Sequence, residues 1–123
     1  MNKVCLSGFL VKDIELKQTQ NGKNVTSNRI AVSREIKDKD GNYITDFINF
    51  VAWEKQAEYL SKYATKGDRI ELVGRWQTRT FTDKDGKNQT ANEVLVENIS
   101  VFSRKPKEEA DENINVKEED LPF

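Results

Sequence analysis

The sequence of 123 residues predicts an all-β domain, a small barrel of five strands with one short helix between the third and fourth strands, followed by an acidic tail. Three observations lead to this prediction. Five segments alternate or cluster β-branched and aromatic residues, which is the pattern of short strands. Only one segment has helical periodicity. After residue 105 the chain becomes strongly charged with few apolar residues, a composition typical of disorder.

The first predicted strand covers Lys3 to Val11, with a continuation at Ile14 to Lys17. The other four strands are predicted at Val25 to Ile36, Tyr43 to Trp53, Arg69 to Thr82, and Thr90 to Phe102. Between them lie the tripeptide Gln-Asn-Gly at 20–22 and two copies of Asp-Lys-Asp-Gly, at 38–41 and 83–86, which supply hairpin turn chemistry. Short strands joined by hairpins and one helix favour the five-stranded OB-fold.

The predicted helix covers Glu54 to Ala64, where Ala57, Leu60 and Ala64 recur at intervals of three and four residues. The tripeptide Lys-Gly-Asp at 66–68 ends it. The glycine there can adopt the left-handed conformation that follows many helices.

The charge is divided unevenly between two predicted regions, a domain at 1–105 and a disordered tail at 106–123. The domain carries 18 basic and 14 acidic side chains, whereas the tail carries seven acidic and two basic ones. A basic domain attracts polyanions. The tail acids can fold back onto the basic face and compete with a polyanion, most strongly at low salt.

No leader is recognisable after Met1, and no run approaches the ~18 apolar residues of a membrane span. We therefore expect a cytoplasmic protein with no membrane partner. The single cysteine, Cys5, cannot form an internal disulfide. Its neighbours Val4, Leu6 and Phe9 suggest that it is packed and not reactive.

Residues two apart in a strand share a face, so parity separates core from surface. In the third strand it gives a core face of Ile44, Ile48, Phe50 and Ala52, and an opposite face of Phe47, Asn49, Val51 and Trp53. In the fourth it predicts a core face of Ile70, Leu72, Gly74 and Trp76, and an outer face of Arg75, Gln77, Arg79 and Phe81.

Interleaved rings and cations suit single-stranded nucleic acid, because unpaired bases stack on aromatic rings for roughly 1 to 3 kcal/mol each while cations neutralise phosphates. The alternative is that the rings are core or subunit-contact residues. The expected phosphate contacts are Lys3, Arg34, Lys37, Lys39, Lys55, Arg75, Arg79, Lys84 and Lys87. Most of these cations have an equally simple alternative as solvated surface side chains.

Catalysis has little support in this composition. The chain has no histidine, one cysteine, no glycine-rich phosphate loop and no cysteine cluster, so nucleophile-base pairs and common zinc sites are absent. The Asp-Lys-Asp-Gly turns place glycine at position four, whereas a calcium EF-hand needs it at six. We expect no enzyme, no cofactor, no metal and no small-molecule substrate.

Several motifs together resemble the bacterial and phage single-stranded DNA-binding protein family. They are Asn-Lys-Val at 2–4 with Leu-Ser-Gly at 6–8, Asp-Phe-Ile-Asn-Phe-Val-Ala-Trp at 46–53, Lys-Gly-Asp at 66–68, Gly-Arg-Trp-Gln-Thr-Arg-Thr-Phe at 74–81, and the ending Glu-Glu-Asp-Leu-Pro-Phe at 118–123. The spacer from Lys105 to Lys117 is shorter than in many relatives, which suits a phage or plasmid protein.

The resemblance implies an OB-fold homotetramer that coats single-stranded DNA with little sequence preference at the nucleoid or replication fork, in the host cytoplasm for a phage protein. The family's base-stacking positions fall on Phe47, Trp53 and Phe81, and a fourth falls on Ile36, which lacks a π-face. The resemblance also implies that the tail recruits replication, recombination and repair proteins. The residues concerned are Glu118, Glu119, Asp120, Leu121, Pro122 and Phe123.

Two other binding functions stay open from the sequence. One is an OB-fold adaptor whose aromatic residues make subunit contacts and whose tail binds proteins. The other is an RNA-binding OB domain like the cold-shock proteins, although the aromatic and glycine-rich motifs usual there are missing. An enzyme is the most distant alternative.

Overall fold

The structure is a computed structural model that describes residues 1–102. It contains six strands and one helix in the order β1 (Val4–Leu10), β2 (Lys17–Gln18), β3 (Asn24–Lys37), β4 (Tyr43–Trp53), α1 (Lys55–Tyr63), β5 (Arg69–Thr82) and β6 (Asn88–Val101). The five main predicted strands are confirmed to within two residues at each end, whereas the continuation predicted at Ile14 to Lys17 is wrong except for Lys17, where β2 begins. From the second predicted strand onward, each strand's label is one higher than its predicted number, because β2 is a separate strand of two residues.

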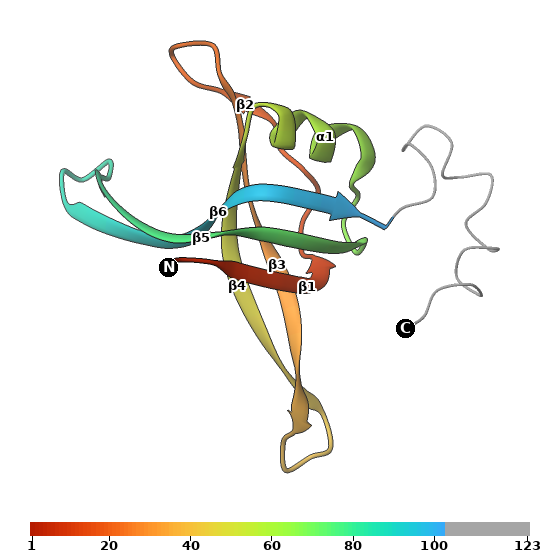
Figure 1. Ribbon diagram of the computed structural model, residues 1–123. Helices are drawn as coiled ribbons and strands as arrows, with labels where there is room; N and C mark the ends of the chain where they lie inside the picture. The colour runs from red at the N-terminus through yellow and green to blue at the C-terminus, as the bar shows by residue number, and fades with distance from the viewer. Residues whose placement is uncertain (103–123) are drawn as a thin grey trace.

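The strands form one sheet in the order β1-β5-β6-β4-β3-β2, and a pairing between β1 and β3 closes it into a barrel. All pairings are antiparallel except the short parallel one between β4 and β6. Phe9 and Leu10 of β1 pair with residues 31 and 30 of β3 at the closure. The predicted five-stranded barrel of OB type, with one helix between β4 and β5, is confirmed (Figure 1).

The core fills the barrel with aliphatic side chains around one ring, Phe50, which is 1% exposed. Its other members are Leu10, Ile30, Ala52, Leu60, Ala64, Ile70, Leu72, Val94, Val96 and Ile99. Helix α1 lies at the end of the barrel opposite the tip of the β3–β4 hairpin (Figure 1) and buries Ala57 and Leu60 against it. The Tyr59 hydroxyl accepts a hydrogen bond from the Val101 N–H at 3.0 Å, which fixes α1 to β6.

The connection from β4 to α1 turns sharply at Glu54, whose φ of 52° is left-handed. Two hydrogen bonds with Asn24 support this conformation: the Glu54 N–H donates to the Asn24 carbonyl at 2.8 Å, and the Glu54 Oε1 accepts from the Asn24 N–H at 3.0 Å. A non-glycine residue at positive φ costs free energy and persists where its surroundings hold it. The pair therefore fixes the end of β4, where Trp53 lies.

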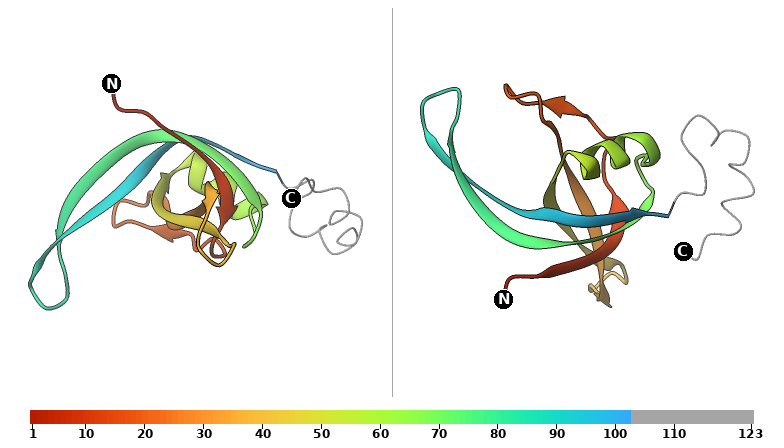
Figure 2. Two further views of the ribbon diagram at one scale, coloured as in Figure 1. Left: turned by 90° about the horizontal axis from the view of Figure 1, so that it is seen from below. Right: turned by 45° about the horizontal axis from the view of Figure 1, so that its top comes forward.

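Two hairpins extend beyond the barrel in different directions, β3–β4 and β5–β6 (Figures 1 and 2). The two Asp-Lys-Asp-Gly sequences form their tips, as predicted, with Gly41 at φ 84° and Gly86 at φ 79°. In each tip the first aspartate, Asp38 or Asp83, accepts hydrogen bonds at 2.9 to 3.0 Å from the backbone N–H groups two and four residues later. The repeated sequence therefore builds the same turn twice.

Two glycines allow neighbouring strands to approach closely: Gly8 brings β1 close to β3, and Gly74 brings β5 close to β6. A Cβ at Gly8 would lie 2.2 Å from the Ala31 carbonyl oxygen, and one at Gly74 would lie 2.2 Å from that of Leu95. Gly74 also adjoins the irregularity in the β5–β6 pairing, between Val73 and Gly74. Both glycines are required by the barrel, since either side chain would push its backbone neighbour away.

The prediction that Trp76 fills core space is wrong. Its side chain is 45% exposed. The pairing of β1 with β5 ends at Gly74. The pairing of β4 with β6 is limited to two residue pairs, Phe50 with Val94 and Val51 with Leu95. Beyond Gly74 the β5–β6 hairpin leaves the barrel, so parity continues but no layer lies beneath Trp76.

The expectation that Cys5 is packed is also wrong, since it is exposed. Cys5 pairs with Val73, which is 37% exposed, while its neighbour Leu6 pairs with the buried Leu72. Alternation therefore points Cys5 outward. Apolar neighbours in sequence could not reveal this, because adjacent strand residues face opposite sides.

The predicted disordered tail at 106–123, and with it the boundary at 105, lies outside the described residues. The part of the chain that the structure describes contains no helix long and apolar enough to cross a membrane.

Candidate nucleic-acid interface

The outward side of β3 and β4 carries two exposed rings, as parity predicted. Phe47 is 53% exposed and Trp53 is 39% exposed, whereas Phe50 between them points into the core. The Arg29 guanidinium of β3 lies over the Phe47 ring, 5.6 Å from its centroid. We call this side, with Arg29, Phe47 and Trp53, the outer face.

A cleft of about 290 Å³ lies where the outer face meets the β5–β6 hairpin. It is lined by Val25, Ser27, Val51, Trp53, Gln77, Arg79 and Glu93. The parallel pairing of Val51 with Leu95 brings β4 beside β6, and the pairing of Gln77 with Glu93 brings in β5. We call it the Glu93 cleft. Val51 shares the predicted outward parity but is only 4% exposed, because it lies at the cleft wall.

Glu93 is the buried acidic residue of this cleft and is 6% exposed. Its carboxylate accepts a hydrogen bond from Arg79 Nε at 2.9 Å and a longer one from Nη2 at 3.4 Å. It also accepts one from Gln77 Nε2 at 2.8 Å. A buried carboxylate needs such partners, and here both come from the β5 residues assigned to the candidate interface.

Phe81 extends the set of exposed rings onto the β5–β6 hairpin, where it is 42% exposed. The Arg79 guanidinium lies over its ring at 5.3 Å from the centroid. Arg75, two residues before the cleft side chains, is exposed on the same face of β5. Lys84 and Lys87 lie at the exposed tip of this hairpin.

The β3–β4 hairpin carries Ile36, which is 66% exposed, and beside it Lys37, whose ammonium lies 5.1 Å from the centroid of the Tyr43 ring. Arg34 forms a two-pronged ion pair with Asp46, both hydrogen bonds measuring 3.0 Å. The hydrogen bonds from Arg34 hold the pKa of the Asp46 carboxyl below its ordinary value, and they raise the pKa of the guanidinium. This arginine is thus matched by an acid.

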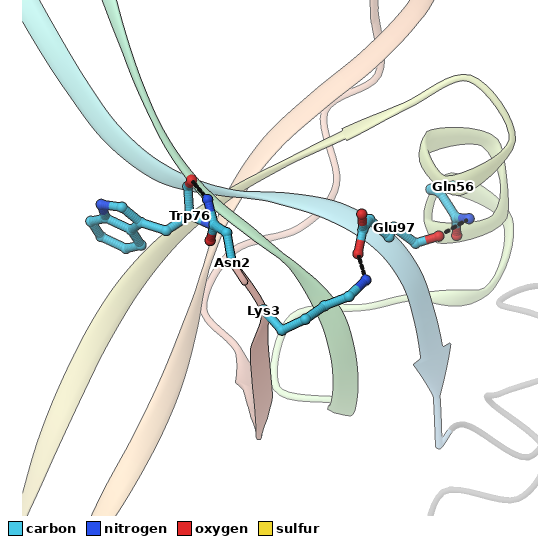
Figure 3. Close-up of polar contacts among 5 residues, drawn as sticks. All are labelled: Asn2, Lys3, Gln56, Trp76 and Glu97. Carbon is cyan, nitrogen blue, oxygen red and sulfur yellow. Dashed lines mark hydrogen bonds and ion pairs between the residues drawn. The ribbon is translucent and has the colours of Figure 1, made fainter.

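Lys3 lies just before β1, next to Val4, which pairs with Gly74 of β5. Figure 3 shows its ammonium paired with Glu97 of β6, whose backbone carbonyl accepts a hydrogen bond from Gln56 at 3.0 Å. In the same view Asn2 bonds to the backbone of Trp76, with its amide donating at 2.8 Å and accepting at 2.9 Å. The indole of Trp76 points away from this cluster.

The predicted phosphate contacts therefore fall into two groups. Lys3, Arg34 and Arg79 are each in an ion pair. The others have no ion pair within residues 1–102: Lys37, Lys39, Lys55, Arg75, Lys84 and Lys87. The structure brings Trp53 and Arg79 together at one cleft, and it distributes Phe81 and Ile36 onto separate hairpins.

Sequence reasoning missed Arg29, Tyr43 and Glu93. Parity could have identified Arg29, because it alternates with Ser27 and Ala31 on the outward side of the second predicted strand, Val25 to Ile36. Tyr43 is 59% exposed but stands at the strand end, where parity gives little guidance. Glu93 was recognisable only once β4, β5 and β6 were placed side by side. Among residues 1–102, no group of three or more potential metal ligands occurs.

A closed OB-type barrel with rings and cations interleaved on an exposed face defines a class, the OB-fold domains suited to unpaired nucleic acid. The chain belongs to the Single-strand binding protein family, whose model matches residues 1–102. That description names a binding protein and no reaction, in agreement with the expectation that the chain is not an enzyme.

Curated relatives agree with the family. The chain is 39% identical over 105 residues to a single-stranded DNA-binding protein of Oceanobacillus iheyensis, covering 85% of this chain and 65% of the relative. It is 38% identical to single-stranded DNA-binding protein 1 of Streptococcus pyogenes, covering 85% and 81%. It is 42% identical over 99 residues to the protein of Bacillus cereus, covering 80% and 58%. The chain thus spans between about three fifths and four fifths of these relatives' lengths.

Proposed function

We propose that this protein binds single-stranded DNA and coats it with little sequence preference. The observation that supports this best is the outer face, where Phe47 and Trp53 are exposed on the strand whose opposite side forms the core. Exposed rings offer stacking surfaces to any base, because every base has a π-face. The unpaired cations on both hairpins supply phosphate neutralisation, the second requirement for a strand that follows the surface.

Phe47, Trp53 and Phe81 are the proposed stacking residues, with Ile36 as a weaker packing contact. Cations over two of these rings, Arg29 at Phe47 and Arg79 at Phe81, suit a surface that meets bases and phosphates together. Duplex DNA keeps its base faces stacked and offers no comparable partner. Single-stranded DNA is therefore favoured over duplex by the same surface.

The binding is tested by titrating the protein with oligothymidine, and with duplex of equal length, while following tryptophan fluorescence. The Trp76→Phe variant should be used, since Trp76 is also exposed and would add a second signal. The mass of the assembly in solution, determined first, sets the stoichiometry and tests the homotetramer that the resemblance implies. We expect quenching by the single strand, weakening as salt rises.

Absence of both quenching and binding would contradict the proposal and favour the OB-fold adaptor, in which the rings contact protein. Equal affinity for oligouridine and oligothymidine would leave the stacking mechanism in place but remove the preference for DNA. The relevant compartment is the cytoplasm, where single-stranded DNA is exposed during replication and repair.

We further propose that the last six residues, 118–123, recruit replication, recombination and repair proteins, with 1–105 as the DNA-binding domain and 106–123 as the tail. The support is chemical: Leu121 and Phe123 are apolar at the end of an acidic segment, and Pro122 limits the conformations lost on docking. Deleting Phe123 should abolish capture of partner proteins while oligothymidine affinity stays unchanged or rises slightly. Undiminished capture by the shortened chain would refute this role.

A further inference from the structure

Arg75 and Arg79 lie four residues apart on one face of β5, yet their surroundings differ. Arg79 is bound to the buried carboxylate of Glu93 through Nε at 2.9 Å. Arg75 is exposed and has no ion pair within residues 1–102. The charge of Arg79 is therefore already matched, and the Glu93 cleft as a whole is neutral, with one cation and one anion.

The hydrogen-bonding groups that remain on the β5 side of the cleft are those of Gln77 and Arg79, while the Ser27 hydroxyl and the Trp53 indole N–H also belong to the lining. Gln77 uses Nε2 to bond Glu93, which leaves its Oε1 as an acceptor. Arg79 uses Nε and, at 3.4 Å, Nη2, so that Nη1 keeps its N–H groups as donors. One acceptor and one donor group thus remain on two side chains that are held by the same carboxylate.

The cleft lining from β3 and β4 is mostly apolar and aromatic, with Ser27 as its one residue with a hydroxyl group. Val25 and Val51 form one part, and Trp53 supplies a ring. A volume of about 290 Å³ with apolar walls and a few placed polar groups is the usual character of a site for a flat organic ring. A phosphate, which carries its charge at every edge, gains little from a neutral cleft of this kind.

We propose that the Glu93 cleft binds the edge of one nucleobase, that Gln77 and Arg79 contact this edge, and that Glu93 is the positioning residue for both. This inference rests on the proposed binding of single-stranded DNA. Each of the four DNA bases has an acceptor beside a donor on its Watson–Crick edge, so such a cleft tolerates any sequence. The same edge is occupied in a duplex, so the cleft rejects paired bases independently of stacking.

Base contact and phosphate contact are separated by the dependence of affinity on salt. For single strands the slope of log K against log salt is about −0.7 for each phosphate neutralised. Oligothymidine affinity is measured from low to high salt for the wild-type chain and for Arg75→Gln, Arg79→Gln and Glu93→Gln. Thermal unfolding of each variant confirms that it is folded under these conditions.

We expect Arg79→Gln to bind roughly three- to tenfold more weakly at every salt concentration with an unchanged slope, because it loses a hydrogen bond and no phosphate. Arg75→Gln, the matched control, should reduce the slope by about 0.7. Glu93→Gln removes the charge that holds Gln77 and Arg79, and it should weaken binding by a similar factor at every salt concentration with an unchanged slope, because no phosphate contact is lost.

The inference is overturned if Arg79→Gln reduces the slope as Arg75→Gln does, which would return Arg79 to the phosphate contacts. It is also overturned if Glu93→Gln leaves the affinity unchanged while the wild-type chain binds the strand, since Glu93 would then position neither side chain. If the wild-type chain does not bind oligothymidine, the proposed function itself fails, so the two failures are distinguishable.

Discussion

The double variant Phe47→Ala/Trp53→Ala is expected to bind oligothymidine roughly a hundredfold more weakly than the wild-type chain. Each stacked base contributes about 1 to 3 kcal/mol, and the two rings lie six residues apart on β4, about 20 Å along an extended strand. Contacts at that separation are usually additive. The single variants should therefore each show about half of the lost binding free energy.

This loss should come from binding and not from folding, because Phe47 is 53% exposed and Trp53 39% exposed. Substitutions at exposed positions usually change stability within about 0.5 kcal/mol, and the partial burial of Trp53 in the Glu93 cleft adds a modest cost. Affinity is measured by anisotropy of a labelled oligonucleotide, since the double variant lacks the Trp53 signal. Thermal unfolding is measured in parallel.

Phe102→Ala is a matched control. Phe102 is 51% exposed and carries a guanidinium over its ring, that of Arg69 at 5.7 Å from the centroid, but it follows β6 at the far end from the β5–β6 hairpin tip. Its replacement should leave oligothymidine affinity unchanged. A loss of less than about threefold in the double variant, or an equal loss in Phe102→Ala, would show that the outer-face rings are not specific stacking surfaces.

The strands and the outer face were predictable because side-chain alternation carries over from sequence to barrel wherever a strand has a core on one side. In β4 this separates Phe47 from Phe50 correctly. The same rule failed at Trp76, since parity identifies a side of the strand but not whether a layer covers that side. Beyond Gly74 the β5–β6 hairpin stands clear of the barrel, and the alternation does not reveal the residue at which it leaves.

The Glu93 cleft could not be predicted for a different reason. Glu93 and Gln77 face each other only through the β5–β6 register, and Val51 joins them through the parallel pairing of β4 with β6. Both relations link residues distant in sequence. From the sequence alone, a glutamate before an apolar run is expected at the surface. Its burial is explained only by the three-dimensional position of Gln77 and Arg79, which bond to its carboxylate.

Phe50→Ala is expected to lower the free energy of unfolding by about 3 to 5 kcal/mol, the cost of removing a large aromatic side chain from a packed core. Phe50 is 1% exposed and, among the buried core residues of 1–102, is the one ring beside aliphatic side chains. Domains of this size are stable by about 5 to 15 kcal/mol, so the variant loses a large part of the total. Urea denaturation should give a lower midpoint with an unchanged slope.

Phe50→Leu is the conservative counterpart, because it keeps most of the apolar volume and should cost appreciably less than the alanine variant. A loss below about 1 kcal/mol in Phe50→Ala would contradict the packing described for the barrel. Phe47→Ala, the same substitution three residues earlier on the opposite side of β4, should leave the urea midpoint nearly unchanged.

Conversely, the Phe50→Ala variant should still bind oligothymidine with wild-type affinity at urea concentrations well below its midpoint, because Phe47 and Trp53 remain on the outer face. The two phenylalanines of one strand would then separate stability from binding, which is the division that strand parity predicts.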